Sequence, residues 1–262
     1  MASFDIIGSK DKAVAIIEIR DDSEDEYKIA KKIMKENKNV KSVLRKLSGR
    51  EGEYRTREYS VVVGNPNTEV VHKEYGYSIK IDPQKTYFSV REGPERQKIA
   101  KQVKPGQIVM VMFAGVGPYA IAIAKNQPGV EKVIGIDINP DAIGYMKENV
   151  RINKLSHKII PILGDVKTET GTWYGKCDHI VMPLPLKAAD FLDVALKCSK
   201  KGSVIHLYGK GNKLDGDVFS ESRQEIKYRM GELGADYEIV NERIVLPYAP
   251  GRFKVCIEFK VL

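Results

Sequence analysis

The sequence predicts an α/β protein with a mostly parallel sheet, closed by an antiparallel terminal hairpin and preceded by a small α+β domain. From about residue 92, strand-like and helix-like segments alternate. The strand segments are nearly continuous apolar runs, as expected of parallel strands buried on both faces. The last two strand segments are separated only by a Pro-Tyr-Ala-Pro-Gly turn. Too few residues separate them for a crossover, so they must pair antiparallel.

The first third of the chain predicts the small α+β domain. Ser23 and Glu26 resemble a capping box that opens a helix reaching about Asn37. We find no helix-strand repeat of the α/β kind here, which favours a separate domain over residues 1–80. The expected strands are Phe4–Ile7, Ala13–Ile19, Val40–Leu47, Tyr59–Val63 and a pair around Val70–Ile81 that bends at Gly76.

Residues 81–262 predict the larger domain, a seven-stranded sheet of the class I (Rossmann-like) kind. The expected strands are Ile108–Phe113, Val133–Ile138, Ile159–Leu163, His179–Met182, Ser203–Leu207, Tyr237–Val245 and Phe253–Lys260. The expected helices are Glu95–Val103, Pro118–Lys125, Asp141–Asn153, Ala188–Ser199 and Glu221–Leu233.

Composition narrows the class of protein. No run of about 18 uncharged apolar residues exists and the N-terminus lacks a signal peptide's apolar core, so we expect a cytoplasmic protein without membrane contact. Three widely spaced cysteines suggest buried thiols, with neither a metal site nor disulfides. The 43 Lys and Arg against 35 Asp and Glu give a net charge of +8, which favours a polyanionic partner. The same richness in Lys and Glu is also typical of thermal adaptation.

A glycine loop predicts a cofactor site at the strand ends. Gly115 and Gly117 begin a G-x-G-x-x-A pattern at the first strand-to-helix turn of the larger domain. Asp137 ends the next strand, 22 residues after Gly115, where a carboxylate would meet ribose hydroxyls. Together these residues indicate a cofactor that contains adenosine. A nicotinamide dinucleotide and S-adenosylmethionine both fit at this point.

Further features favour S-adenosylmethionine. Pro118 removes an amide that a pyrophosphate would bind at the helix N-terminus. Asp165, in Gly-Asp-Val at the end of the third strand, is placed for an adenine amino group, and the terminal hairpin is typical of methyltransferase sheets. Each acid also has a plainer interpretation, as a helix cap or a surface carboxylate. These features are specific in combination because the glycine loop, Asp137 and Asp165 follow consecutive strands in order, at the sheet edge where such sheets bind ligands.

The sequence resembles the archaeal and eukaryotic tRNA (guanine-37) N1-methyltransferases and their relatives in wyosine biosynthesis. The resemblance covers nearly the whole chain and is carried by GEYRTRE, FSxRxxxER, MFAGVGP, IDINPDAI, ENVRINK, KIIPILGDV, PLPxxAxxFLDxA and RIVxxYAPG. It implies an S-adenosylmethionine-dependent enzyme that binds the anticodon stem-loop of tRNA and implies no protein partner. A further N-terminal domain of the family is expected to be missing from this chain.

The resemblance also implies roles for individual residues. Methylation at guanine N1 needs a base for the N1 proton and a cation for the charge that develops on O6. The family's base matches Glu95, and its O6-stabilising arginine matches Arg55. Arg96 matches a contact near the methionine carboxylate of the cofactor. The remaining cofactor-binding positions are Phe113, Gly115, Gly117, Asp137, Ile138, Asp165, Val166 and Pro183.

Two departures from the family pattern keep alternatives open. Val111 stands where relatives usually carry an Asp, and Pro183 where they carry an Asn beside the target base. A wyosine-pathway enzyme, methylating a carbon or transferring an aminocarboxypropyl group, is therefore the runner-up, and dual activity stays open. Retention of Glu95 and of the PLPxxAxxFLD block favours N1 methylation. From other classes, a nicotinamide-dependent oxidoreductase and a non-catalytic tRNA-binding module remain as alternatives.

Overall fold

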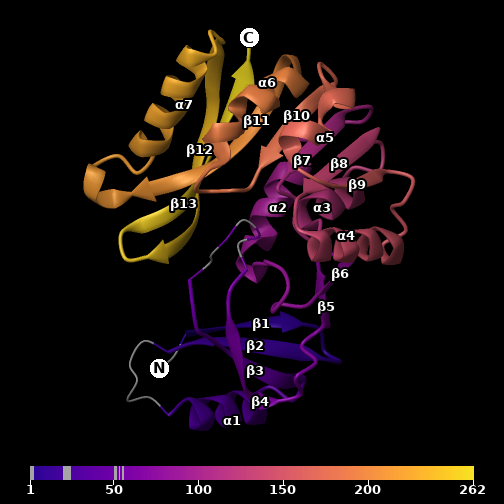
Figure 1. The fold of residues 1–262 in the computed structure, drawn as a ribbon, viewed down its shortest axis with the longest axis vertical. Helices are drawn as coiled ribbons and strands as arrows, with labels where there is room; N and C mark the ends of the chain where they lie inside the picture. Colours follow the sequence, from indigo (N-terminus) through magenta and orange to yellow (C-terminus); the bar gives the residue numbers. More distant parts are fainter. Residues whose placement is uncertain (1–2, 20–24, 50–51, 53, 55) are drawn as a thin grey trace.

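A computed structural model describes residues 3–19, 25–49, 52, 54 and 56–262, which form a large α/β unit and a smaller one (Figure 1). The large sheet has the strand order β12-β13-β11-β10-β7-β8-β9. Only β13 runs against its neighbours β11 and β12, and the other recorded pairs are parallel, which confirms the predicted sheet and terminal hairpin. Its strands are β7 (Ile108–Met112), β8 (Lys132–Asp137), β9 (Ile159–Leu163), β10 (Cys177–Met182), β11 (Ser199–Asn212), β12 (Tyr237–Ala249) and β13 (Arg252–Val261).

Helices cover both faces of the large sheet because successive side chains of a strand point to opposite faces. Val109 and Val111 of β7 pack in one core with α2 (Gly93–Ala100), α3 (Pro118–Asn126) and α4 (Pro140–Ile152). Met110 and Met112 pack in the other core with α6 (Leu192–Cys198) and α7 (Ser220–Glu232). Short helical segments complete the unit: η1 (Val90–Glu92), α5 (Val166–Glu169), η2 (Gly171–Trp173), η3 (Ala188–Phe191) and η4 (Lys213–Asp215).

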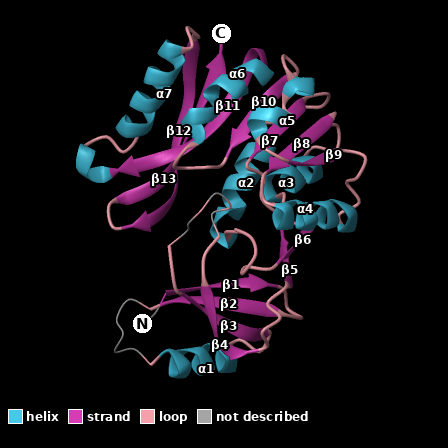
Figure 2. Cartoon of the chain, in the orientation of Figure 1, coloured by secondary structure: helices cyan, strands magenta, loops and turns pink. Residues whose placement is uncertain are grey.

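The small unit has the strand order β1-β2-β3-β4, and α1 (Glu26–Glu36) lies at the end of the molecule opposite the large sheet (Figure 2). Its strands are β1 (Ser3–Gly8), β2 (Ala13–Glu18), β3 (Val40–Lys46) and β4 (Tyr59–Gly64). β2 and β3 are parallel and α1 connects them, so a helix-strand repeat does exist here and the expectation of none was wrong. A short amphipathic helix between two apolar strands gives the same pattern in either topology. The cap of α1 is Asp25, which accepts from Lys28 N at 3.0 Å, while Ser23 lies outside the described residues.

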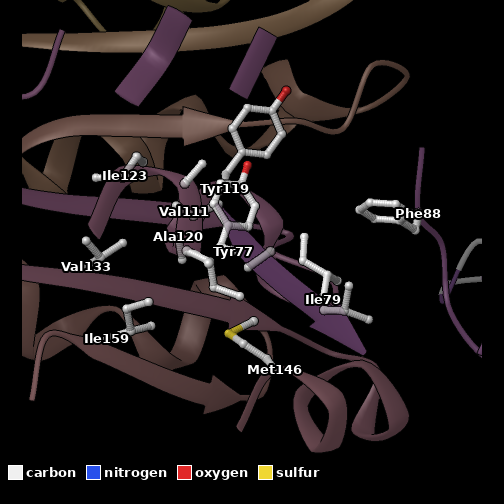
Figure 3. Close-up of a cluster of buried hydrophobic side chains, with 14 of the residues drawn as sticks. Tyr77, Ile79, Phe88, Val111, Tyr119, Ala120, Ile123, Val133, Met146 and Ile159 are labelled. Carbon is white, nitrogen blue, oxygen red and sulfur yellow. The ribbon is translucent and has the colours of Figure 1, made fainter. Parts of the chain in front are cut away.

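A two-stranded hairpin, β5 (Val70–Glu74) and β6 (Tyr77–Ile81), joins the two units. Tyr75 and Gly76 take positive φ values of 43° and 81° at its turn, where a bend was predicted. Tyr77 and Ile79 lie in the same apolar cluster as side chains of β7 and α3 (Figure 3). Side chains of α4 bond the backbone of β6, at Ser78 and Lys80. A domain boundary at residue 80 stays a prediction.

Other differences from the expected elements are small. The helix expected over Ala188–Ser199 begins as the 3-10 turn η3, and β11 runs well beyond the expected Leu207, to Asn212. Within the described residues, no helix is long and apolar enough to cross a membrane.

Candidate active site

The loop after β7 has an unusual backbone that brings amide groups to the strand ends. Phe113, Gly115 and Gly117 have φ values of 56°, 57° and 83°, in the left-handed region. The Asp137 carboxylate, at the end of β8, accepts from Gly115 N at 2.7 Å and from Asn139 N at 2.9 Å. Burial raises the pKa of Asp137, and these backbone hydrogen bonds oppose that rise. Asp137 therefore fixes the loop.

The two glycines of this loop have different structural roles. A side chain at Gly117 would meet Met146 Cγ at 2.6 Å, so that glycine allows α4 to pack closely. A side chain at Gly115 would meet only Tyr87 O, at 3.9 Å, within the described residues. Gly115 thus leaves open space beside backbone amides, as a ligand cradle requires. The residues present fit an adenosine-containing cofactor on this observation.

The other predicted cofactor residues lie at the same edge of the sheet, after neighbouring strands. Phe113 packs edge-on against Phe191 with ring centroids 4.9 Å apart, and Pro183 is half-buried after β10. Asp165 is exposed after β9 and caps α5, accepting from Lys167 N at 2.9 Å, while Val166 is buried. Asn139 caps α4, and Ile138 is half-buried before it. The structure thus brings these positions together, and their contacts with a cofactor stay predictions.

Glu95 lies on α2 and faces β11 and β12, and its side chain is 4% exposed. Tyr208 of β11 donates to Glu95 Oε1 at 2.7 Å. Arg243 of β12 contacts the same carboxylate, with Nη2 to Oε1 at 2.5 Å. A buried carboxylate is stable as an anion only when it is paired in this way.

Arg96, the next residue, points into a different set of partners. Its guanidinium donates to both carboxylate oxygens of Glu74, at 2.8 and 2.7 Å, and to Ser89 O at 3.1 Å. Although burial acts in the opposite direction, hydrogen bonds from His72 and Arg96 lower the pKa of Glu74 to about 2. Arg96 is 1% exposed, so in this structure it braces the hairpin against α2. Its role as a cofactor contact stays a prediction.

Arg55 lies outside the described residues. The residues that follow it in the GEYRTRE motif, Thr56 and Arg57, line a small cavity together with Tyr87 and Phe88. Tyr87 donates to Glu92 Oε1 at 2.8 Å, one turn of α2 from Glu95. Thr56 and Arg57 therefore lie close to Tyr87, which contacts Glu92 at the start of α2.

The sequence did not single out several charged residues that surround Glu95. Lys254 of β13 pairs with the buried Glu92 at 2.9 Å, and Glu258 of β13 pairs with Arg243 at 2.7 Å. The one available signal was Arg243, which begins the RIVxxYAPG motif. The other partners lie in strands where the alternation of apolar and polar residues did not indicate a charged residue at a buried position.

The structure also shows where the two residues that depart from the family pattern, Val111 and Pro183, lie. Val111 is fully buried in β7, between Gly135 of β8 and Val181 of β10. An ionised side chain there would need a partner, and the apolar side chain needs none. Pro183 directly follows β10 at the strand edge that carries Phe113 and Asp137.

Comparison with known proteins agrees with this fold. Residues 70–246 match the family described as "TRM5/TYW2 methyltransferase domain", and residues 1–68 match "TYW2 N-terminal domain". The chain therefore belongs to the TRM5/TYW2 methyltransferase family, whose methyl donor is S-adenosylmethionine. Because the chain belongs to this family, the alternative of a nicotinamide-dependent oxidoreductase is set aside.

Three relatives are informative. The tRNA (guanine(37)-N(1))-methyltransferase Trm5b of Pyrococcus abyssi is 40% identical over 99% of this chain and 74% of its own length. The structure of the complex of aTrm5 and tRNALeu has a TM-score of 0.84 at 38% identity, over 99% of this chain and 72% of that one. TYW2 of Pyrococcus horikoshii, in complex with MeSAdo, has a TM-score of 0.82 at 28% identity, over 99% and 90% of the two chains.

Proposed function

We propose that this protein methylates N1 of guanosine 37 in tRNA, in the cytoplasm, and that it binds the anticodon stem-loop. The observation that carries the proposal is Glu95, a buried carboxylate paired with Arg243 at the strand edge where the glycine loop and Asp137 lie. A relative 40% identical over 99% of the chain is named as a methyltransferase for this position. The net charge of +8 suits a polyanionic substrate.

The reaction requires a proton to leave guanine N1 as the new bond forms. When bound, S-adenosylmethionine supplies an electrophilic methyl group. Glu95 accepts the N1 proton, and Arg55 stabilises the negative charge that develops on O6. Gly115 and Asp137 hold the adenosine part of the cofactor, with Phe113, Ile138, Asp165 and Val166 around it. Because the Glu95 side chain is only 4% exposed, we expect tRNA binding to open a path to it.

A wyosine-pathway reaction is the second candidate, on a specific observation. Residues 1–68 match a family named for TYW2, and Pro183 offers the target base only a carbonyl where relatives carry an Asn. These features favour a bulkier, less polar target base. Such an enzyme would methylate a carbon of the tricyclic base, act on both targets, or transfer the aminocarboxypropyl group.

Nucleoside mass spectrometry separates the two candidates. The full chain is incubated with S-adenosylmethionine labelled separately in its methyl and aminocarboxypropyl groups, and with tRNA transcripts carrying guanosine 37, adenosine 37 or the tricyclic wyosine precursor. We expect labelled 1-methylguanosine from the first transcript and no methylated product from the second. Label only in the tricyclic base would contradict the proposal and support the second candidate. Absence of label in all three would leave a non-catalytic tRNA-binding module.

A further inference from the structure

The contacts of Glu95 differ sharply between its two carboxylate oxygens. Oε1 receives Tyr208 O–H at 2.7 Å, Arg243 Nη2 at 2.5 Å and Arg243 Nε at 3.1 Å. Within the described residues, Oε2 receives only the shared Arg243 Nε, at 3.0 Å. A carboxylate oxygen that already accepts three hydrogen bonds has little capacity for another proton donor. Oε2 is therefore the oxygen with room to accept a proton.

Arg243 is itself held by a second carboxylate. Its Nη1 atom lies 2.7 Å from Glu258 Oε1. Glu258 also accepts from Gln102 at 2.8 Å and from Asn241 at 3.0 Å, and it lies 2.9 Å from His206 Nδ1. The guanidinium thus bridges two buried carboxylates from opposite sides. Its orientation is fixed by β13 and not by Glu95 alone.

Every titratable group that faces Glu95 can be named by the element that presents it. Tyr208 comes from β11, Tyr119 from α3 and Cys256 from β13, and burial raises the pKa of all three, so they are neutral at neutral pH. Lys254 lies 4.7 Å from the Tyr208 ring but pairs with Glu92. Among the described residues, Arg243 is the one cation in contact with Glu95.

We propose that Arg243 is a positioning residue for methyl transfer: together with Tyr208 it pairs with the Glu95 carboxylate and orients it so that Oε2 accepts the guanine N1 proton. The proposal rests on N1 methylation as the function. The N1–H bond breaks, the proton moves to Oε2, and the N1 electron pair forms the bond to the methyl carbon as the carbon–sulfur bond breaks. Arg243 touches neither substrate nor cofactor and acts through Glu95.

The test variant is Arg243→Gln, with single-turnover methylation measured from pH 5.5 to 8.5 at saturating tRNA. Loss of a cation in contact raises a carboxyl pKa by roughly 1–3 units. The ratio of variant to wild-type rate should therefore fall about tenfold or more from pH 8 to pH 6, because a carboxylate that has lost its contacting cation takes up a proton at a higher pH than a paired one. Taking the ratio cancels ionisation of the tRNA substrate. KM for tRNA should stay within about twofold, since the Arg243 side chain is only 11% exposed and its guanidinium contacts Glu95 and Glu258.

Matched variants keep the test decisive. Arg223 of α7 pairs with Glu242, the neighbour of Arg243 on β12, but its side chain is 41% exposed. Arg223→Gln should leave the rate ratio near one at every pH. Arg243→Lys keeps a cation and should restore most of the rate at pH 6. Arg243→Gln removes the cation between the Glu95 and Glu258 carboxylates. If this single variant does not fold, the double variant with Arg243→Gln and Glu258→Gln is used, because it no longer has two facing carboxylates.

The outcomes separate this proposal from the function on which it rests. A rate ratio independent of pH, or a raised KM with an unchanged maximal rate, would overturn the positioning role while 1-methylguanosine remains the product. A lowered melting temperature with a normal pH profile would do the same, because it indicates a structural role only. If the wild type labels a carbon and not N1, no N1 base is needed, and both proposals fail.

Discussion

The candidate site has two halves, which we call the cofactor half and the base half, and each is held in place by different interactions. Around β7 and β8, the cofactor half is held by backbone geometry: positive φ angles, close glycine packing and amide hydrogen bonds to Asp137. Around α2, β12 and β13, the base half is held by buried charges, in the pairs of Glu95 with Arg243 and Glu92 with Lys254. Both halves are well buried, so burial alone does not distinguish them.

The difference predicts how each half responds to change. The positive φ angles and the close glycine packing involve no titrating group, so their contribution to stability should not vary with pH. The titrating group of the cofactor half is Asp137. Buried ion pairs depend on protonation, and removal of one partner leaves an uncompensated charge that costs more than the pair itself contributes. Substitutions in the base half should therefore have larger and pH-dependent effects, while those at the glycines of the cofactor half should be smaller and constant.

The largest effect is expected from Glu95→Gln. The amide keeps the shape of the side chain but cannot accept the N1 proton, so single-turnover methylation of guanosine-37 tRNA should fall by about 10²–10⁴-fold. Binding of S-adenosylmethionine, followed by equilibrium dialysis, should stay within about twofold of the wild type. A rate within a few-fold of the wild type would remove Glu95 from the role of base.

Glu74→Gln tests a buried pair next to the base. It leaves Arg96, which is 1% exposed, without its charge partner, and such a loss costs roughly 3–5 kcal/mol of unfolding free energy. The pKa of Glu74 is lowered to about 2, so its contribution to stability is present above the unfolded pKa near 4.5 and is lost as pH falls towards 2. Urea unfolding at pH 7 and pH 3 should show a large deficit at the higher pH and a smaller one at the lower.

The matched control is Glu26→Gln, whose partner Arg45 also lies at 2.8 Å but whose side chains are 38% and 30% exposed. Exposed pairs contribute roughly 0–1 kcal/mol. Equal losses in the two variants would mean that burial does not set the value of the Glu74 pair.

Much of the cofactor half could be predicted from sequence because its determinants are local. Gly115 and Gly117 stand next to the strand they follow, and Asp137 is one strand-helix-strand step away. The base half could not, because Glu95 meets Arg243 across 148 residues and no local pattern reports that pairing. The β2–α1–β3 crossover was missed for a related reason: apolar strands and one helix do not specify whether the second strand runs parallel or antiparallel.

A third prediction concerns His179, which continues the base half behind Glu258. His179 Nδ1 lies 3.0 Å from His206 Nε2, and burial followed by the proximity of His206 lowers the pKa of His179 to about 4. The unfolded chain takes up this proton near pH 6.5, so stability is full above that pH and falls as pH decreases from 6.5 to 4. The loss over this window should be about 3 kcal/mol, from 1.36 kcal/mol per pKa unit.

Urea unfolding of the wild type and of His179→Asn at several pH values measures this term. The variant should be less stable at pH 7 and should lose less stability between pH 6.5 and 4 than the wild type does. His157→Asn is the control, because that side chain is already exposed in the folded protein. Parallel curves for the wild type and His179→Asn would show that His179 takes up its proton normally when folded.

The smallest effect is expected in the cofactor half, from Gly117→Ala. Its φ of 83° and the 2.6 Å approach of a new Cβ to Met146 Cγ together should cost about 1–3 kcal/mol of unfolding free energy. Gly144→Ala, on α4 with no atom within 4 Å of the new Cβ, should instead stabilise by about 0.5–1 kcal/mol. Because neither the Gly117 backbone nor the Met146 side chain titrates, the Gly117→Ala deficit should be the same at pH 8 and pH 5. A deficit that changes with pH would show that the packing of Gly117 against Met146 is coupled to a titrating group such as Asp137, and the contrast between the two halves would fail.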